Sequence, residues 1–232
     1  MREPINVSGM VLSASPVGEY DKRVVILTRE LGKITAFARG ARRMKSPLMA
    51  VSNPFVFGEF QVYEGRDSYT LSGANIKEYF LDLAQTQPGV YYGFYFLELA
   101  EYFSQEGNDE TQMLNLLYVT MNAIRRGKQD LRLIRCIFEL RTITISGEAP
   151  QMFSCMECST KENLTIFSPR DSAIYCQNCG KTIKDPWPLQ PGTVLACRYI
   201  IAAPLEKLYG FTVNEEILDE LERLLRAYLH RY

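Results

Sequence analysis

The feature that most constrains this chain is a set of four cysteines arranged as two close pairs. Cys155 and Cys158 form the first C-x2-C pair, and Cys176 and Cys179 form the second after seventeen intervening residues. Each C-x2-C turn places two thiolates on one tight loop, and two such loops joined by a short hairpin complete a tetrahedron around Zn²⁺. Because four protein ligands leave no open coordination position, the pattern predicts one structural zinc per chain.

The segment between the two pairs has the composition of a β-hairpin. Residues 164–168 and 173–175 have the composition of strands, and the turn residues 169–172 separate them. An iron site of the same spacing and a redox dithiol are the alternatives, although a redox dithiol needs only one C-x2-C pair. The remaining cysteines, Cys136 and Cys197, lie on apolar faces of predicted helices, which is typical of inert core thiols.

Compartment and membrane association follow from the apolar pattern. The first residues contain no apolar segment of the kind found in secretory signals, and nowhere do eighteen apolar residues follow one another. Paired cysteines in a chain without an export signal indicate reduced thiols around a metal. We therefore expect a cytoplasmic protein with no membrane partner.

Charge and motifs exclude several classes of function. The 26 Lys and Arg residues nearly balance the 27 Asp and Glu residues, which excludes nucleic-acid binding through overall charge but leaves room for a local basic face. The single histidine, His230, disfavours serine–histidine and cysteine–histidine catalysis. The sequence also lacks a phosphate-binding G-x4-G-K-[ST] loop, a G-x-G-x-x-G motif and an H-E-x-x-H motif. We therefore expect that the protein is not an enzyme.

Residues 1–80 have the pattern of a small β-barrel. About five short strands alternate apolar and polar residues and are separated by Gly and Pro turns, as in the OB-fold. A shift of apolar parity at Gly9 predicts a β-bulge there.

The period then changes to that of helices. Apolar residues recur at three- and four-residue steps, which predicts helices over 90–104, 109–126, 130–146 and 193–209 and a last helix opened by a capping box of Thr212 and Glu215. The predicted fold is α+β and multidomain: a barrel over 1–80, a helical domain over 81–150 plus 191–232, and an inserted zinc module over 151–190.

A basic cluster lies within the predicted barrel. Residues 22–45 contain eight Lys or Arg and only one carboxylate, Glu30. The period of a strand places Lys33, Phe37 and Arg39 on one outward face, where cations can follow phosphates and a ring can stack a base. A solvated strand face with a charged loop is the alternative. We predict that nucleic acid is bound by the following residues: Lys22, Arg23, Lys33, Phe37, Arg39, Arg42, Arg43 and Lys45.

Three stretches of the sequence resemble the RecO family of bacterial DNA-repair mediators. They are residues 17–21 (VGEYD) through 27–33 (LTRELGK), residues 38–43 (ARGARR) with Lys45-Ser46 and Pro54-Phe55, and Phe138-Glu139-Leu140 with Gly147, Pro150 and the first cysteine pair. The resemblance covers essentially the whole chain. It implies an N-terminal OB-fold, a helical domain and an inserted zinc module, and its basic barrel residues map onto Lys33, Arg39, Arg42, Arg43 and Lys45.

The resemblance also implies an activity and partners. It implies binding of single- and double-stranded DNA, ATP-independent annealing of complementary strands, and help in loading recombinase on coated single-stranded DNA, in the nucleoid. The implied partners are RecR and the acidic C-terminal tail of single-stranded DNA-binding protein. Some members lack the cysteines, whereas this chain has all four. We predict that Arg135, just before Phe138-Glu139-Leu140, and Arg132 bind the tail, although arginines lying along a solvated helix surface explain them more simply.

Two other functions remain open from the sequence. One is a protein-interaction scaffold with a structural zinc, in which the basic loop docks an acidic partner. The other is an enzyme with a structural zinc, for which the sequence offers no acid, base or nucleophile constellation.

Overall fold

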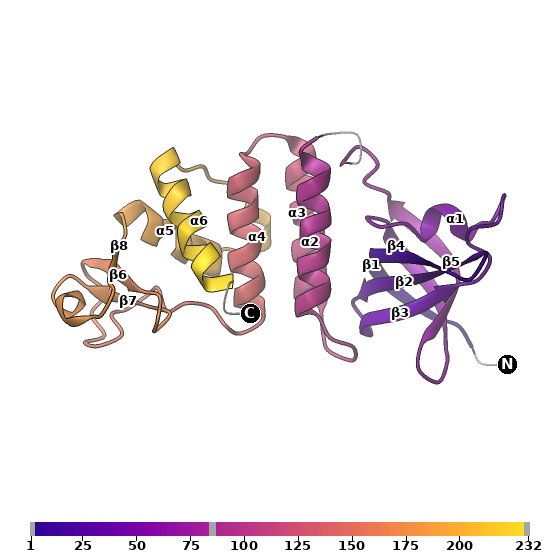
Figure 1. The fold of residues 1–232 in the computed structure, drawn as a ribbon, viewed down its shortest axis with the longest axis horizontal. Helices are drawn as coiled ribbons and strands as arrows, with labels where there is room; N and C mark the ends of the chain where they lie inside the picture. Colours follow the sequence, from indigo (N-terminus) through magenta and orange to yellow (C-terminus); the bar gives the residue numbers. More distant parts are fainter. Residues whose placement is uncertain (1–2, 84–86, 230–232) are drawn as a thin grey trace. The chain divides into compact units, whose positions relative to one another are not determined.

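The computed structural model describes residues 3–83 and 87–229, and the chain divides into two compact units, Met1–Arg125 and Arg126–Tyr232. Unit 1 contains a β-barrel and two long helices, and unit 2 contains three further helices and a small sheet (Figure 1). The division separates the predicted helical domain between two units. The three-domain organisation expected from the sequence remains a prediction.

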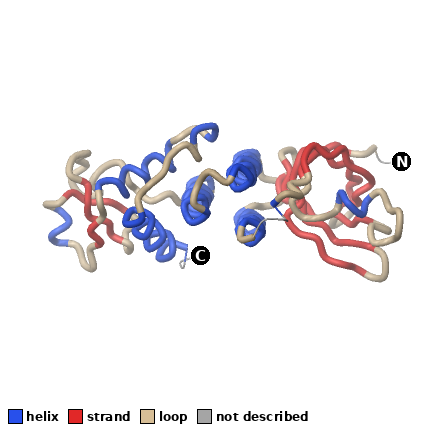
Figure 2. The backbone as a smooth tube through the Cα atoms, turned by 90° about the horizontal axis from the view of Figure 1, so that it is seen from above, coloured by secondary structure: helices blue, strands red, loops and turns tan. Residues whose placement is uncertain are grey.

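The barrel of unit 1 closes in the strand order β1-β2-β3-β5-β4. Its strands enclose a common interior (Figure 2). All neighbouring strands are antiparallel except β3 and β5, which pair in parallel, and β1 closes the barrel by pairing with β4. The five strands expected from the sequence are confirmed with these bounds: β1 (Ile5–Val17), β2 (Asp21–Thr28), β3 (Gly32–Ala38), β4 (Phe57–Glu64) and β5 (Tyr69–Glu78).

Strand alternation fills the barrel. Val24 and Ile26 of β2 face Ala36 and Ile34 of β3 inside, and Phe60 of β4 completes the same buried cluster. On β3, Thr35 and Phe37 alternate with these inner residues and lie on the outer face, as the two-residue period of a strand requires. A short helix that the sequence did not predict, α1 (Leu48–Val51), also contributes buried residues to this cluster.

The expected bulge at Gly9 is wrong, because the register of β1 against β2 shifts between Val11 and Ser13. Met10 and Leu12 are buried but do not belong to the cluster inside the barrel. They lie on the outer face of β1, against which α2 (Gly89–Phe103) packs. A strand that is covered on both faces carries apolar residues at successive positions, and this imitates the parity shift of a bulge.

The segment that follows α2 forms backbone hydrogen bonds with the residues around the start of β3. The amide of Lys33 donates to Gln105 O at 3.0 Å, and the amide of Gly107 donates to Leu31 O at 3.1 Å. The next helix, α3 (Thr111–Arg126), contacts the barrel through Tyr118, whose ring centroid lies 4.7 Å from that of Phe57. These contacts cover one end of the β2–β3 face and leave the other end, at Arg39, exposed.

Unit 2 holds the helices α4 (Leu131–Ile145), α5 (Pro191–Ala202) and α6 (Glu215–Leu229), which pack on one another. The residues between α4 and α5 in the sequence form a three-stranded sheet in the order β7-β6-β8. The predicted hairpin is confirmed as β6 (Leu164–Ser168) and β7 (Ala173–Cys176), followed by a 3-10 turn, η2 (Cys179–Thr182). The third strand, β8 (Trp187–Pro188), was not predicted and pairs with β6 just before α5 begins.

Two expectations about the last helices are wrong. The predicted helix over 193–209 ends at Ala202, because Pro204 lacks an amide hydrogen and holds the preceding Ala203 in an extended conformation. A separate 3-10 turn, η3 (Leu205–Lys207), follows. The N-cap of α6 is Asn214, whose Oδ1 accepts from the amide of Ile217 at 2.9 Å, so Thr212 and Glu215 form no capping box.

The observed cap gives a direct test. We expect Asn214→Ala to lower the free energy of unfolding of unit 2 by about 1 kcal/mol, because one amide at the start of α6 loses its acceptor. Trp187 is the only tryptophan, and Arg223 of α6 lies 4.8 Å from its ring centroid, so urea unfolding followed by its fluorescence reports on this unit. Thr212→Ala is the matched control and should change the value by less than about 0.5 kcal/mol. A larger effect for Thr212→Ala than for Asn214→Ala would contradict the assignment.

Candidate nucleic-acid interface and metal centre

The two cysteine pairs lie on two adjoining turns of unit 2. Cys155 is held by its own amide, which donates to Thr160 O at 2.8 Å, and by the amide of Met156, which donates to Ile174 O at 3.0 Å. Cys176 ends β7, and the amide of Cys179 points at its sulfur at 3.5 Å. The hairpin β6–β7 thus brings together two turns that are separated in the sequence.

The four cysteine sulfurs all lie within 4.8 Å of one another. The Sγ atoms of Cys158 and Cys176 are 3.8 Å apart. Four sulfurs at about 2.3 Å from a central Zn²⁺ ion lie about 3.8 Å apart in a tetrahedron, so the spacing fits a metal ion better than a disulfide, whose sulfurs are about 2 Å apart. These residues can therefore hold a metal ion, as the sequence predicted.

The thiols of the cluster differ in acidity. Although burial of its thiol opposes ionisation, the amides of Cys158, Cys176 and Glu157 lower the pKa of Cys155 to about 6. The hydrogen bond to Cys176 raises the pKa of Cys179 to about 12. Four thiolates at this spacing repel one another, and a divalent cation among them removes the repulsion and displaces the remaining protons.

The other two cysteines are core residues. Cys136 and Cys197 are buried in α4 and α5, and burial raises the pKa of each thiol to about 12. A neutral, inaccessible thiol is unreactive, so the prediction of inert core thiols agrees with their surroundings.

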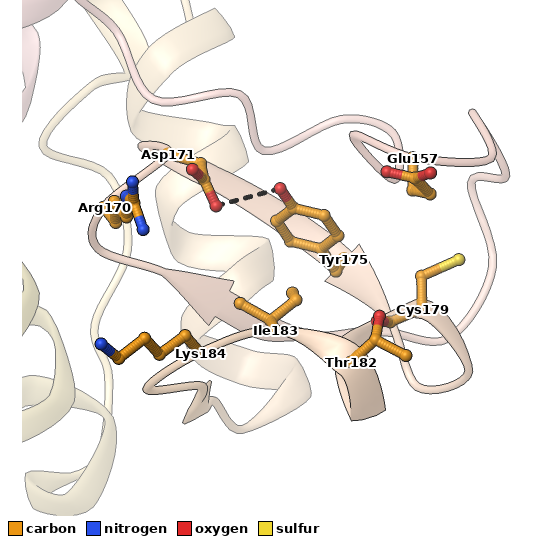
Figure 3. A pocket seen from close by; sticks show the side chains of 8 residues that line it. All are labelled: Glu157, Arg170, Asp171, Tyr175, Cys179, Thr182, Ile183 and Lys184. Carbon is orange, nitrogen blue, oxygen red and sulfur yellow. Dashed lines mark hydrogen bonds between the residues drawn. The ribbon is translucent and has the colours of Figure 1, made fainter.

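A cavity of about 220 Å³ lies beside the metal-binding residues (Figure 3). Its wall carries Arg170 and Lys184 as well as Glu157 and Asp171, and the Tyr175 hydroxyl donates to Asp171 across it at 3.1 Å. Charges of both signs on one small wall favour no single class of ligand. The cavity follows from the packing of the hairpin on η2, and we assign it no function.

The second candidate site lies at one end of the barrel, where two loops join. The amide of Arg42 donates to Tyr20 O at 2.8 Å, and the amide of Gly40 donates to Asp21 Oδ1 at 2.7 Å. These bonds connect the β1–β2 loop to the loop that follows β3. They bring Lys22 toward Arg42, and burial together with that guanidinium lowers the pKa of Lys22.

Most of the predicted nucleic-acid-binding residues lie at this end of the barrel. Arg23 and Phe37 are direct cross-strand partners on the outer face, and Arg39 directly follows the end of β3. The side chains of four cations in and after β3 are exposed: Arg39, Arg42, Arg43 and Lys45. Within residues 3–83 and 87–229, no carboxylate forms an ion pair with any of the seven predicted cations. The described part of the chain therefore provides no ion pair that neutralises the positive charge of this surface.

Lys33 does not join this group. Its Nζ atom donates to Glu101 O at 2.5 Å, at the carboxyl end of α2. It lies six residues from Arg39 along an extended strand, a distance of about 20 Å. A lysine at this position satisfies a terminal helix carbonyl and complements the helix dipole, which accounts for the residue without a nucleic acid.

Two residues that the sequence did not single out complete the basic end of the barrel. Tyr20 lies at the tip of the β1–β2 loop, with the guanidinium carbon of Arg43 5.0 Å from its ring centroid. Asn53 accepts from Lys22 Nζ at 2.7 Å and orients that amine. Neither contact could be found from sequence spacing, because each joins residues more than twenty positions apart.

The predicted partner-binding arginines of α4 are already engaged by carboxylates. Arg132 forms ion pairs with Glu215, Asp219 and Glu222 of α6. Arg135 forms ion pairs with Glu222 at 2.6 Å and with Glu139 at 3.6 Å. The acidic residues that open α6 therefore face the arginines of α4.

Two family models together match nearly the whole chain. The model described as the N-terminal domain of recombination protein O matches residues 1–80, which contain the barrel. The model described as its C-terminal domain matches residues 88–232.

The chain belongs to the RecO family. Curated relatives support the assignment over nearly the full length. DNA repair protein RecO of Alkaliphilus metalliredigens is 32% identical over 97% of this chain and 92% of its own length. The proteins of the same name from Bacillus pumilus and Dehalococcoides mccartyi are each 30% identical, over 98% and 94% of this chain and 89% and 86% of their own lengths.

Among the described residues, no helix has both the length and the apolar character needed to cross a bilayer.

The ion pairs between α4 and α6 give a pH-dependent prediction. The hydrogen bond from Arg132, together with the charge of Arg135, lowers the pKa of Glu222. A carboxyl whose pKa is lowered by folding contributes stability above its unfolded pKa and loses that contribution as the pH falls through its folded pKa. We expect Glu222→Gln to lower the free energy of unfolding at pH 7 by about 1–2 kcal/mol.

The same variant should lose less stability than the unaltered chain between about pH 5 and pH 3, measured by urea unfolding with Trp187 fluorescence. Asp219→Asn is the control, because this carboxylate is 63% exposed whereas Glu222 is 15% exposed. Its effect should stay below about 0.5 kcal/mol. Equal changes in the free energy of unfolding for the two substitutions would contradict the prediction, because they would show that burial of Glu222 does not strengthen its ion pairs.

Proposed function

We propose that this chain is a non-enzymatic DNA-binding protein of DNA repair and recombination. It binds single- and double-stranded DNA, anneals complementary strands, and helps load recombinase on coated single-stranded DNA without nucleotide hydrolysis. The observation that supports this proposal is the exposed group of Arg39, Arg42, Arg43 and Lys45, which no carboxylate of the described residues neutralises. The names of the curated relatives support the repair function.

The barrel supports the proposal as an OB-fold. Five strands in the order β1-β2-β3-β5-β4, with a parallel contact between β3 and β5, have the connectivity expected of that fold. OB-folds bind oligonucleotides on the face of strands β2 and β3 and on the adjoining loops. In this chain that face carries Arg23 and Phe37, and the adjoining loop carries Arg42 and Arg43.

The proposed mechanism is electrostatic. Cations that contact phosphates release the counterions condensed on the strand, and this contributes affinity without reading the sequence. Two strands held on one cationic surface repel each other less and meet at a higher local concentration, so complementary segments pair faster. Neither step needs a nucleophile, an acid or a nucleotide.

The proposed partners are RecR and the acidic C-terminal tail of single-stranded DNA-binding protein, in the cytoplasm at the nucleoid. A tail that binds Arg132 and Arg135 has to replace the carboxylates of Glu215, Asp219 and Glu222. This exchange preserves the charge balance of both arginines, but it separates α6 from part of its contact with α4.

We propose that the metal is Zn²⁺ and that its role is structural. The donor set consists of four sulfurs and no oxygen, which zinc prefers, and four protein ligands leave no position for a reacting water. The module over 151–190 is too small to bury a core of its own, so the metal would join its two turns.

Charge reversal tests the proposed DNA-binding surface. We expect the triple substitution Arg39→Glu, Arg42→Glu and Arg43→Glu to weaken DNA binding by more than about 100-fold at low salt, because attraction to phosphates becomes repulsion. Fluorescence anisotropy of a labelled oligonucleotide across a salt series measures the change. The salt dependence of the remaining affinity should also become shallower.

The matched control reverses three exposed cations of unit 2: Arg126, Lys128 and Lys207. Both triple variants change the net charge by the same amount. A difference between their DNA affinities would therefore come from the location of the substituted residues. Equal loss of affinity in the two variants would overturn the proposed site. Salt-independent binding by the unaltered chain would favour a protein-interaction scaffold.

The metal proposal predicts one zinc ion per chain in elemental analysis of the purified protein. We expect Cys155→Ser to lose the metal and to lower solubility, because Cys155 is a buried ligand. Cys197→Ala removes a buried thiol outside the cluster and should retain the metal. Unaltered protein that is fully folded and free of metal would contradict the proposal.

A further inference from the structure

The tip of the β1–β2 loop presents an aromatic ring among the cations of the basic end of the barrel. Tyr20 is 41% exposed, so part of its ring is open to solvent. The Arg43 guanidinium carbon lies 5.0 Å from the ring centroid, in the position of a cation–π contact. Arg42 is bound to the same loop, because its amide donates to the carbonyl of Tyr20 and its Nη1 atom donates to Gly18 O at 3.4 Å.

The position of the ring is fixed by the backbone. Gly40 adopts a φ of +66°, which turns the chain after β3 so that its amide donates to Asp21 Oδ1. The amide of Arg43 then donates to Gly40 O at 3.0 Å. This turn directs the Arg43 side chain back toward the β1–β2 loop, with its Cδ atom only 3.5 Å from where a Cβ at position 40 would lie. Tyr20 and Arg43 are thus pre-organised before any ligand binds.

A ring held in this way offers one property that the arginines do not. Cations attract any phosphate chain, whether single- or double-stranded, but a ring beside them can stack only on a base that is free of its own neighbours. Bases inside a duplex are already stacked and cannot reach a ring on the protein surface. A ring in such a position would therefore distinguish unpaired strands from paired ones.

We infer that Tyr20, covered by Arg43 and flanked by Arg42, is a stacking site for an unpaired base of single-stranded nucleic acid. The site gives the barrel a preference for single strands over duplexes. This inference rests on the proposed DNA-binding function and deepens it, because it names the state of the strand that the basic surface receives.

Substitution of the ring tests the inference. We expect Tyr20→Ala to weaken binding of oligothymidylate by about 5- to 150-fold, which corresponds to the 1–3 kcal/mol of one base–aromatic stack. Affinity for a duplex of equal length should change by less than about twofold, and the slope of affinity against salt should stay the same, because no phosphate contact is removed. Retained duplex binding also shows that the barrel of the variant is folded.

Two variants serve as controls. Tyr20→Phe keeps the ring and loses only the hydroxyl, so it should bind oligothymidylate as the unaltered chain does. Tyr91 of α2 is 63% exposed and lies outside the basic end, so Tyr91→Ala should leave both affinities unchanged. Loss of single-strand affinity in Tyr20→Phe, or an equal loss for duplex in Tyr20→Ala, would overturn the stacking role.

A direct contact can be measured by photocrosslinking. An oligothymidylate with one 5-iodouracil, irradiated in the complex, should form a crosslink to the peptide that contains Tyr20, and the yield should fall in Tyr20→Ala. Crosslinks confined to other peptides would overturn the inference. If the unaltered chain binds no DNA, the proposed function fails as well. If the arginine triple variant loses binding while Tyr20→Ala retains full single-strand affinity, only the stacking site fails.

Discussion

Like charges repel, so the cations at one end of the barrel stay together only because the backbone holds them there. The bonds from Gly40 to Asp21 and from Arg42 to Tyr20 hold the cation-bearing loop after β3 against the β1–β2 loop. Burial lowers the pKa of Lys22, and repulsion by the Arg42 guanidinium lowers it further. Folding of the barrel core offsets this cost, and an anionic polymer relieves it. The affinity for phosphates that we propose would thus be linked to the folding energetics of unit 1.

Much of this structure follows from local patterns. The alternation of apolar residues predicts the five strands, since a strand such as β3 buries Ile34 and Ala36 and leaves Thr35 between them only half-buried. Apolar residues at three- and four-residue steps predict the long helices, because residues at that spacing share the buried face of a helix. The metal site is also local, because two short turns and one hairpin contain all four ligands.

The remainder depends on partners far away in the sequence. Lys33 reaches the end of α2, 68 residues later, and Arg132 meets Glu222 after 90 residues. A charged residue that will bind a ligand and one that will pair within the fold look the same until the chain is folded. The cap at Asn214 was missed for another reason: Thr212 and Asn214 are both good N-caps, and only the packing of α6 selects between them.

The short strand β8 has a mechanical consequence. It pairs with β6 of the cysteine-bearing hairpin, runs almost directly into α5, and places Trp187 under Arg223 of α6. If the sulfur cluster loosened, β6 and the hydrogen-bonded strand β8 would loosen with it, and so would the start of α5 and the contact of Trp187 with α6. A single ion would thus stiffen two helices that supply none of its ligands.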